Sequence, residues 1–324
     1  MSDLKAPFPW FGGKRRVAAQ IWAALGDVDN YVEPFAGSLA TLLDRPPGHR
    51  GLIKGAETVN DADQFLSNFW RALALHPEET AQWCDWPVNE ADLFARHLWL
   101  VNEGRDRIAK MDDDPDFCDP KVAGWWVWGI NAWIGSGWCS GTGPHRKRPH
   151  LGNAGQGVNR QCPHLGNAGQ GVNRQRPHLG NAGQGVYDYF QALAARLRRV
   201  RVCCGDWARV VTNGATSHGG TVGVFLDPPY LGDVRTSDLY SVDDHTIAHA
   251  VREWALSKGD DPRFRIVLAG YEDEHEALIP PTWRRIAYSA NAAYNSHAGG
   301  GKNKDNRHKE RLWLSPHCLG KGLL

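Results

Sequence analysis

A short apolar run that ends in two prolines constrains the fold of this chain more than any other feature. Val222–Leu226 has the composition of a buried strand, and the tetrapeptide Asp227–Tyr230 (DPPY) follows it directly. Proline has no backbone N–H to give to a strand ladder, so we expect the strand to stop there. In open α/β sheets, ligands bind at the carboxyl ends of strands. The sequence therefore predicts a carboxylate, a stiff backbone and an aromatic ring at a ligand-binding edge.

Strand-like and helix-like segments alternate on both sides of a long middle section. Residues 17–25 have helical apolar spacing and 30–33 is a strand candidate, whereas 200–204, 265–269 and 310–314 are strand candidates after the middle section. This alternation is typical of a mostly parallel sheet with helices on its faces. We predict an α/β, Rossmann-like, doubly wound fold that carries an inserted module of helices and loops.

The middle section, residues 76–189, differs in composition from the rest of the chain. Eight of the fifteen tryptophans lie between Trp83 and Trp138, and a 14-residue unit is repeated in tandem over 148–189. Each unit has three glycines and few apolar residues, so it cannot bury a core of its own. We predict a main domain formed by 1–75 and 190–324, an insert at 76–189, and a mobile surface loop at the repeat.

Bulk properties exclude several classes of protein. No stretch approaches the ~18 consecutive apolar residues of a membrane span, and the first residues lack an apolar signal core. Seven cysteines, an odd number without a CxxC spacing, argue against a disulfide framework and against a zinc knuckle. Fourteen histidines show no ligand spacing, so we predict no metal site. We expect a protein of a reducing cytoplasm.

Basic residues gather in clusters although the formal net charge is only +1. Such clusters can neutralise phosphates, and a solvated helix face is the alternative for each of them. The clusters are at 14–16, 146–148, 196–201 and 302–311.

Six short motifs follow one another in a specific order along the chain. They are PWFGGK at 9–14, EPFAGS at 33–38, NDAD at 60–63, GDW at 205–207, DPPY at 227–230 and ERLW at 310–313. In sequence and order they resemble the Dam-like class of site-specific DNA adenine-N6 methyltransferases. The resemblance covers about 1–75 and 190–315. It implies a Rossmann-like domain that uses S-adenosylmethionine. The position of 76–189 and its arginine and aromatic content make this insert the candidate for target recognition.

The resemblance implies catalytic roles for Asp227, Pro228 and Tyr230. The exocyclic amine of adenine is a poor nucleophile because its lone pair is delocalised into the ring. The Asp227 carboxylate and the Pro228 carbonyl would each accept one hydrogen bond from this amine and orient its lone pair. Tyr230 would stack on the base once it is flipped out of the duplex, and packing is the alternative role for this ring.

The resemblance also implies a set of residues that bind S-adenosylmethionine: Trp10, Lys14, Glu33, Phe35, Gly37, Asp61, Asp206 and Asp227. Trp10 would contact the cofactor and Lys14 would donate a hydrogen bond to it. Asp61 would accept from the ribose hydroxyls and Asp206 from the adenine amine. Structural alternatives remain: core packing for Trp10, a solvated charge or phosphate contact for Lys14, a helix N-cap for Asp61 and a turn for Asp206.

Other functions remain open beside adenine methylation. Cytosine-N4 methylation uses the same amine chemistry, but such enzymes more often carry Ser at the position of Asp227. A catalytically silent, DNA-binding relative is a further alternative. The expected partner is double-stranded DNA, with arginines of the repeat as possible phosphate contacts. The resemblance further implies a monomeric orphan, phage-type or restriction-associated methylase in the cytoplasm of a bacterial or phage-infected cell.

Overall fold

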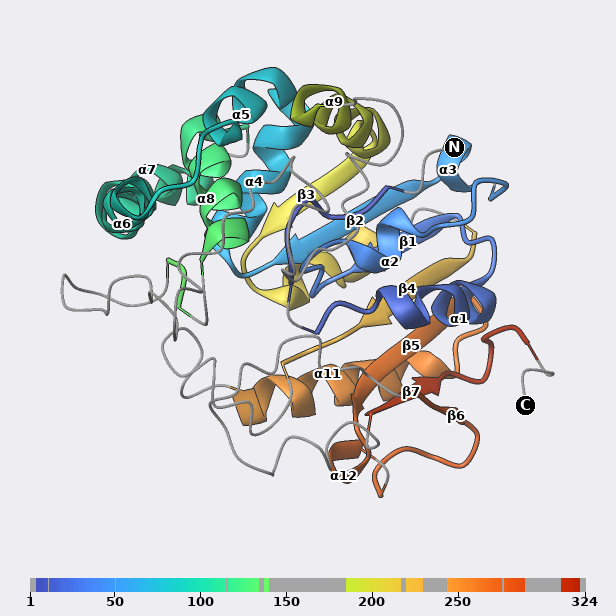
Figure 1. The fold of residues 1–324 in the computed structure, drawn as a ribbon. Helices are drawn as coiled ribbons and strands as arrows, with labels where there is room; N and C mark the ends of the chain where they lie inside the picture. The colour runs from blue at the N-terminus through green and yellow to red at the C-terminus, as the bar shows by residue number, and fades with distance from the viewer. Residues whose placement is uncertain are drawn as a thin grey trace. The chain divides into compact units, whose positions relative to one another are not determined.

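The computed structural model describes residues 4–10, 12–49, 51–114, 116–133, 137–139, 185–216, 220–229, 244–275, 277–288 and 310–320. Within these ranges seven strands form one mixed sheet in the order β3-β2-β1-β4-β5-β7-β6 (Figure 1). The strands are β1 (Asn30–Glu33), β2 (Ala56–Asp61), β3 (Val200–Cys204), β4 (Val222–Leu226), β5 (Phe264–Tyr271), β6 (Arg284–Ala287) and β7 (Glu310–Leu314).

The pairing of the strands is mostly parallel. Strand β1 pairs parallel with β2 and β4, and β4 pairs parallel with β5. Strand β7 runs antiparallel between β5 and β6. The predicted α/β class with a mostly parallel sheet is therefore confirmed, and the architecture is compatible with a Rossmann-like fold.

The chain divides into two compact units. One unit comprises Gly12–Asn60 and Asp206–Leu324, and we call it unit 1. The other comprises Ser2–Phe11 and Asp61–Gly205, and we call it unit 2. The sequence analysis predicts a catalytic domain formed by 1–75 and 190–324 and a target-recognition insert at 76–189. Both roles stay predictions.

Unit 1 is built around β1, β4 and β5, whose side chains are nearly all buried. Its helices are α1 (Arg15–Leu25), α2 (Ala40–Leu43), α3 (Gly51–Lys54), α10 (Asn213–Thr216), α11 (Asp244–Gly259) and α12 (Glu272–His275), with a 3-10 turn at Trp207–Val210. Helix α1 packs on α2, β4 and β5, and α11 packs on β5.

Helix α1 shows how the apolar spacing predicts the packing. Val17, Ile21 and Leu25 lie on one face and are buried, as their spacing of four residues predicts. Full burial of each such side chain contributes about 1.5–3 kcal/mol. The helix ends at Gly26, whose φ of +67° favours glycine. Trp22 on the same helix donates a 2.7 Å hydrogen bond from Nε1 to the Thr41 carbonyl.

Unit 2 is helical apart from β3 and the end of β2. Its helices are α4 (Gln64–Leu75), α5 (Pro77–Cys84), α6 (Glu90–Trp99), α7 (Arg105–Ile108), α8 (Pro120–Ala132) and α9 (Val186–Leu197), with a π-helical turn at Leu100–Gly104 and a 3-10 turn at Ala109–Asp112. Helix α4 packs on α8 and α9, and α5 also packs on both. Asp119 caps α8 by accepting from the Val122 N–H at 3.0 Å.

Tryptophans of unit 2 enclose basic side chains in addition to filling its core. The Arg96 guanidinium lies 4.3 Å from the ring centroid of Trp128 and 5.0 Å from those of Trp86 and Trp125. Cation–π contacts of this kind contribute roughly 0.5–2 kcal/mol each. They fix α6 against α8.

No helix in the described part of the chain is long and apolar enough to span a bilayer. The prediction of a mobile loop falls almost entirely on residues 148–184, which lie outside the described ranges.

Candidate active site

The candidate site lies at the carboxyl ends of β1 and β4 in unit 1. Strand β1 has β2 on one side and β4 on the other, so the order of the strands reverses at this point. Val32 is paired with Val224 in a parallel register, so β1 and β4 end at the same edge of the sheet. Ligands of open α/β sheets bind in the crevice beyond such a switch point. Glu33 and Asp227 follow Val32 and Val224 within three residues.

An ion pair joins the first motif of the sequence to the DPPY motif. The Lys14 Nζ lies 3.0 Å from Asp227 Oδ1, with side-chain exposures of 7% and 17%. The same Nζ donates to the Gly12 carbonyl at 3.0 Å. Removing one partner from a buried ion pair typically costs 3–5 kcal/mol, because a charge is left without compensation. Lys14 thus contacts the expected catalytic carboxylate, a contact that the sequence analysis did not anticipate.

Glu33, the last residue of β1, is a buried carboxyl group beside Asp227. Its exposure is 2%, and the Tyr31 hydroxyl donates a 2.9 Å hydrogen bond to Glu33 Oε2. Burial raises the pKa of Glu33 to about 8, the hydrogen bond from Tyr31 lowers it, and the nearby Asp227 raises it. At neutral pH Glu33 therefore carries a proton, so it is able to donate as well as accept a hydrogen bond.

The loop after β1 is tied to the end of β2 by Asn60. The Asn60 carbonyl accepts from the Ala36 N–H at 2.9 Å, and the Asn60 side chain donates to the Pro34 carbonyl at 3.0 Å. Gly37 has a φ of +48°, a left-handed conformation that explains why glycine occurs here. The predicted glycine loop is thus fixed by backbone and side-chain hydrogen bonds.

Two aromatic rings stack at this edge of unit 1. Phe35 and Trp207 have ring centroids 6.1 Å apart and an interplanar angle of 29°. Trp207 follows Asp206, whose Oδ1 accepts from the Ala208 N–H at 2.8 Å and caps the 3-10 turn. The described contact of Asp206 thus corresponds to the turn alternative. Trp207 is absent from the predicted site residues, although an aromatic residue in a turn after a strand was a usable signal.

Two predicted cofactor-binding residues belong to unit 2. Trp10 packs against Phe8 at 5.9 Å and Trp126 at 6.4 Å between ring centroids, which corresponds to the core-packing alternative. Asp61 Oδ1 accepts from the Asp63 N–H at 2.9 Å. The N-cap of helix α4 is Asp63 and not Asp61, so the N-cap alternative for Asp61 is wrong. Tyr230 lies outside the described residues.

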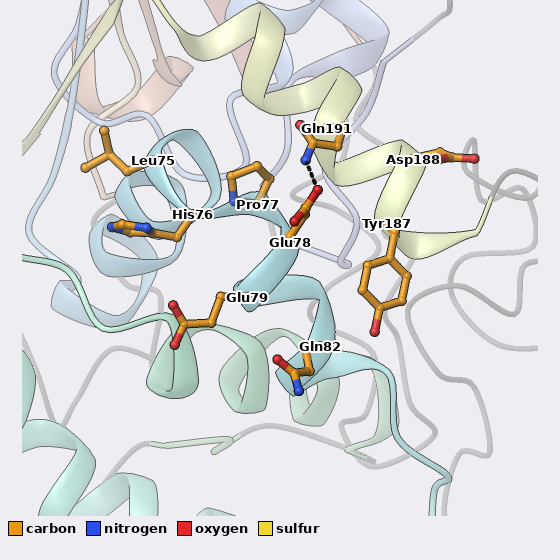
Figure 2. A pocket seen from close by; sticks show the side chains of 9 residues that line it. All are labelled: Leu75, His76, Pro77, Glu78, Glu79, Gln82, Tyr187, Asp188 and Gln191. Atoms are coloured by element: carbon orange, nitrogen blue, oxygen red, sulfur yellow. Dashed lines mark hydrogen bonds between the residues drawn. The ribbon is translucent and has the colours of Figure 1, made fainter.

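Unit 2 also has an open pocket of about 700 Å³. Figure 2 shows Glu78 and Glu79 from α5 and Asp188 from α9 around it, with Gln191 Nε2 donating to Glu78 Oε1 at 3.2 Å. None of the predicted site residues lines this pocket. Its carboxylates disfavour phosphate groups, so the pocket is a poor candidate for a nucleic-acid site.

The described residues contain no group of three or more His, Cys, Asp or Glu side chains that could hold a metal ion. No protein-family model matches this chain, and no curated protein matches it significantly.

Proposed function

We propose that the protein is an S-adenosylmethionine-dependent DNA methyltransferase that acts on the N6 amine of adenine. The observation that supports this most is the 3.0 Å ion pair between Lys14 and Asp227. This ion pair joins the PWFGGK motif to the DPPY motif at the switch point of the sheet. The resemblance depends chiefly on these two motifs. Motifs that agree only by chance have no reason to meet at a ligand-binding edge.

The chemistry of the residues at this edge fits S-adenosylmethionine. When bound, the cofactor supplies a methyl group on a cationic sulfur, which is a good leaving group. Asp227 and Glu33 would accept hydrogen bonds from the ammonium group of the cofactor, and Lys14 would donate a hydrogen bond to an acceptor atom of the cofactor. The stacked rings of Phe35 and Trp207 offer a flat face for an adenine ring or a cation. Within the described residues, no atom lies within 4 Å of the place where a Cβ would stand on Gly12, so the backbone there is accessible.

Asp227 and Pro228 would activate the target amine through hydrogen bonds. A carboxylate has about four lone-pair sites, so Asp227 can hold Lys14 and accept from the amine at the same time. Pro228 is buried and its ring fixes φ, which holds its carbonyl in place as the second acceptor. The cofactor would supply the methyl group to the oriented amine nitrogen and leave as the neutral thioether, and Asp227 or water would accept the surplus proton of the amine.

Lys14 would act as a positioning residue in this reaction. Its ammonium group fixes one oxygen of Asp227, and Lys14 itself is held by the Gly12 carbonyl. Alignment of reacting atoms is the main requirement of methyl transfer, and a misplacement of about 1 Å can cost 10²-fold in rate. By fixing the Asp227 carboxylate, Lys14 would keep the target amine aligned for methyl transfer.

Transfer of tritiated methyl from S-adenosylmethionine to unmethylated duplex DNA tests the proposal. We expect N6-methyladenine on nucleoside analysis, and we expect Asp227→Ala to abolish it while DNA affinity changes little. Because Asp227→Ala leaves the buried Lys14 without its partner, its melting temperature should fall, so activity is compared at a temperature where the variant is folded. Asp260→Ala, a matched change of an exposed carboxylate in unit 1, should keep full activity.

Three outcomes would contradict the proposal. Turnover retained in Asp227→Ala would remove Asp227 from the mechanism. N4-methylcytosine as the product would move the target to cytosine, whereas DNA binding without any methyl transfer by the wild-type protein would favour the silent relative.

A further inference from the structure

Tyr31 is a fully buried tyrosine whose hydroxyl contacts Glu33. The two residues are two positions apart on β1, so their side chains lie on the same face of the sheet. The Tyr31 ring packs on Trp22 of α1 at 4.7 Å between ring centroids, and its hydroxyl donates to Glu33 Oε2 at 2.9 Å. Burial raises the pKa of Tyr31 well above its ordinary value, so the hydroxyl keeps its proton and remains a donor.

The Glu33 carboxyl group is also held from a second element. The backbone N–H of Leu42, in α2, donates to the same carboxyl group. A hydroxyl from β1 and an N–H from α2 therefore fix this group at two points. Phenylalanine would fill the space beside Trp22 equally well, and a hydroxyl is costly to bury unless it has an acceptor. The hydroxyl of Tyr31 is thus explained by its contact with Glu33 and not by packing.

Two carboxylates near Glu33 each have a cation of their own. Asp227, after β4, is paired with the Lys14 Nζ at 3.0 Å. Glu57, on β2, is paired with the Arg45 Nη1 at 3.0 Å, and both side chains of this pair are buried. Burial and, to a lesser degree, these two carboxylates raise the pKa of Glu33. Glu33 differs from both because the donors that hold it are neutral.

We propose that Tyr31 is a positioning residue of the methyl-transfer site, whose hydroxyl fixes the Glu33 carboxyl group for binding of the cofactor. This inference rests on the proposed function, in which Glu33 accepts a hydrogen bond from the ammonium group of S-adenosylmethionine. Without the hydroxyl the carboxyl group is able to rotate, and part of the binding free energy is then needed to fix it again. Tyr31 acts through Glu33 and not on the cofactor directly.

The test uses the full-length chain as wild type, Tyr31→Phe, Glu33→Gln and Tyr189→Phe. Tyr189 provides the matched control because it is also a buried tyrosine, and its hydroxyl donates to the Lys5 carbonyl at 2.6 Å in unit 2. Calorimetry at neutral pH measures the dissociation constant of S-adenosylmethionine. Carboxyl-carbon NMR of protein labelled at glutamate measures the titration of Glu33 without cofactor, and Glu33→Gln identifies the signal by its absence.

Tyr31→Phe should raise the dissociation constant of S-adenosylmethionine about fivefold, which is a typical effect of one lost hydrogen bond. It should also move the titration midpoint of Glu33 above its wild-type value of about 8, because the hydrogen bond that lowers the pKa of Glu33 is lost. Tyr189→Phe should leave both quantities at their wild-type values. Thermal melting shows that each variant is folded at the temperature of the measurements.

A dissociation constant that is unchanged in Tyr31→Phe, or raised equally in Tyr189→Phe, would overturn the positioning role. An unchanged titration midpoint in Tyr31→Phe would overturn it as well, because the hydroxyl would then not hold the Glu33 carboxyl group in solution. Failure of the proposed function gives a different result. A wild-type protein that does not bind S-adenosylmethionine would overturn both proposals, whereas wild-type binding without an effect of Tyr31→Phe overturns only this one.

Discussion

Replacement of Glu33 by Gln should change how the stability of the protein depends on pH. Glu33 is buried with an exposure of 2%, and its pKa is raised to about 8 from an ordinary value of 4.5. The folded state therefore binds more protons than the unfolded state between these two values. By linkage, the free energy of unfolding falls as pH rises through this interval. Gln cannot ionise, and its carbonyl oxygen accepts the hydrogen bond that the Tyr31 hydroxyl gives to Glu33.

The magnitude follows from the two pKa values. Each pH unit between them costs up to about 1.4 kcal/mol, because the unfolded chain releases a proton that the folded chain keeps. From pH 5 to pH 7 the wild-type protein should lose about 2–3 kcal/mol of unfolding free energy through Glu33 alone. His275 acts in the opposite direction, since burial lowers its pKa to about 4 from 6.5, so its contribution to stability is lost as pH falls from 6.5 to 4. The informative quantity is therefore the difference in unfolding free energy between wild type and Glu33→Gln at each pH, because the contribution of His275 cancels in it.

Denaturant unfolding of both proteins at several pH values measures this difference. We expect the stability of Glu33→Gln relative to wild type to increase by about 2–3 kcal/mol from pH 5 to pH 7. Glu103→Gln, a change of an exposed residue on a helix, should show no such trend. A difference between wild type and Glu33→Gln that stays constant with pH would refute the raised pKa and the protonated state derived from it.

Two further predictions concern catalysis and cofactor binding. Lys14→Met should lower the rate of methyl transfer in single-turnover assays by about 10²-fold, because Asp227 loses the partner that positions it, whereas Lys258→Met on α11 should not. An unchanged rate in Lys14→Met would remove the ion pair from the mechanism. Trp207→Leu should raise the calorimetric dissociation constant of S-adenosylmethionine up to about tenfold, because the stack with Phe35 is lost. Trp254→Leu is the matched control, and equal effects in both variants would show that Trp207 only packs.

Local patterns in the sequence predict those helices and strands that have a clear apolar spacing or a clear terminating residue. Strand β4 could be predicted because an apolar run is followed by two prolines, and α1 because its apolar residues recur every four positions. The N-cap of α4 shows the limit of such patterns. Asp61 and Asp63 are equally good caps by residue type, and the backbone path after β2 makes Asp63 the cap.

Contacts between distant segments could not be predicted in this way. Lys14 and Asp227 lie far apart in the sequence, and only the sheet order brings them to one edge. The stack of Phe35 on Trp207 likewise depends on two loops that follow different strands. The raised pKa of Glu33 depends on burial, which the spacing of residues 30–33 does not reveal.

The two carboxyl groups at this edge have different means of avoiding mutual repulsion. Asp227 is paired with an ammonium group, whereas Glu33 keeps its proton because it is buried. Pairs of titratable groups with such divergent environments are typical of sites where one group donates and the other accepts. Under the proposed function, Asp227 would therefore be the charged acceptor that faces the cofactor and the target amine. Above a pH of about 8 this division ends, because Glu33 then ionises and both carboxylates carry a negative charge.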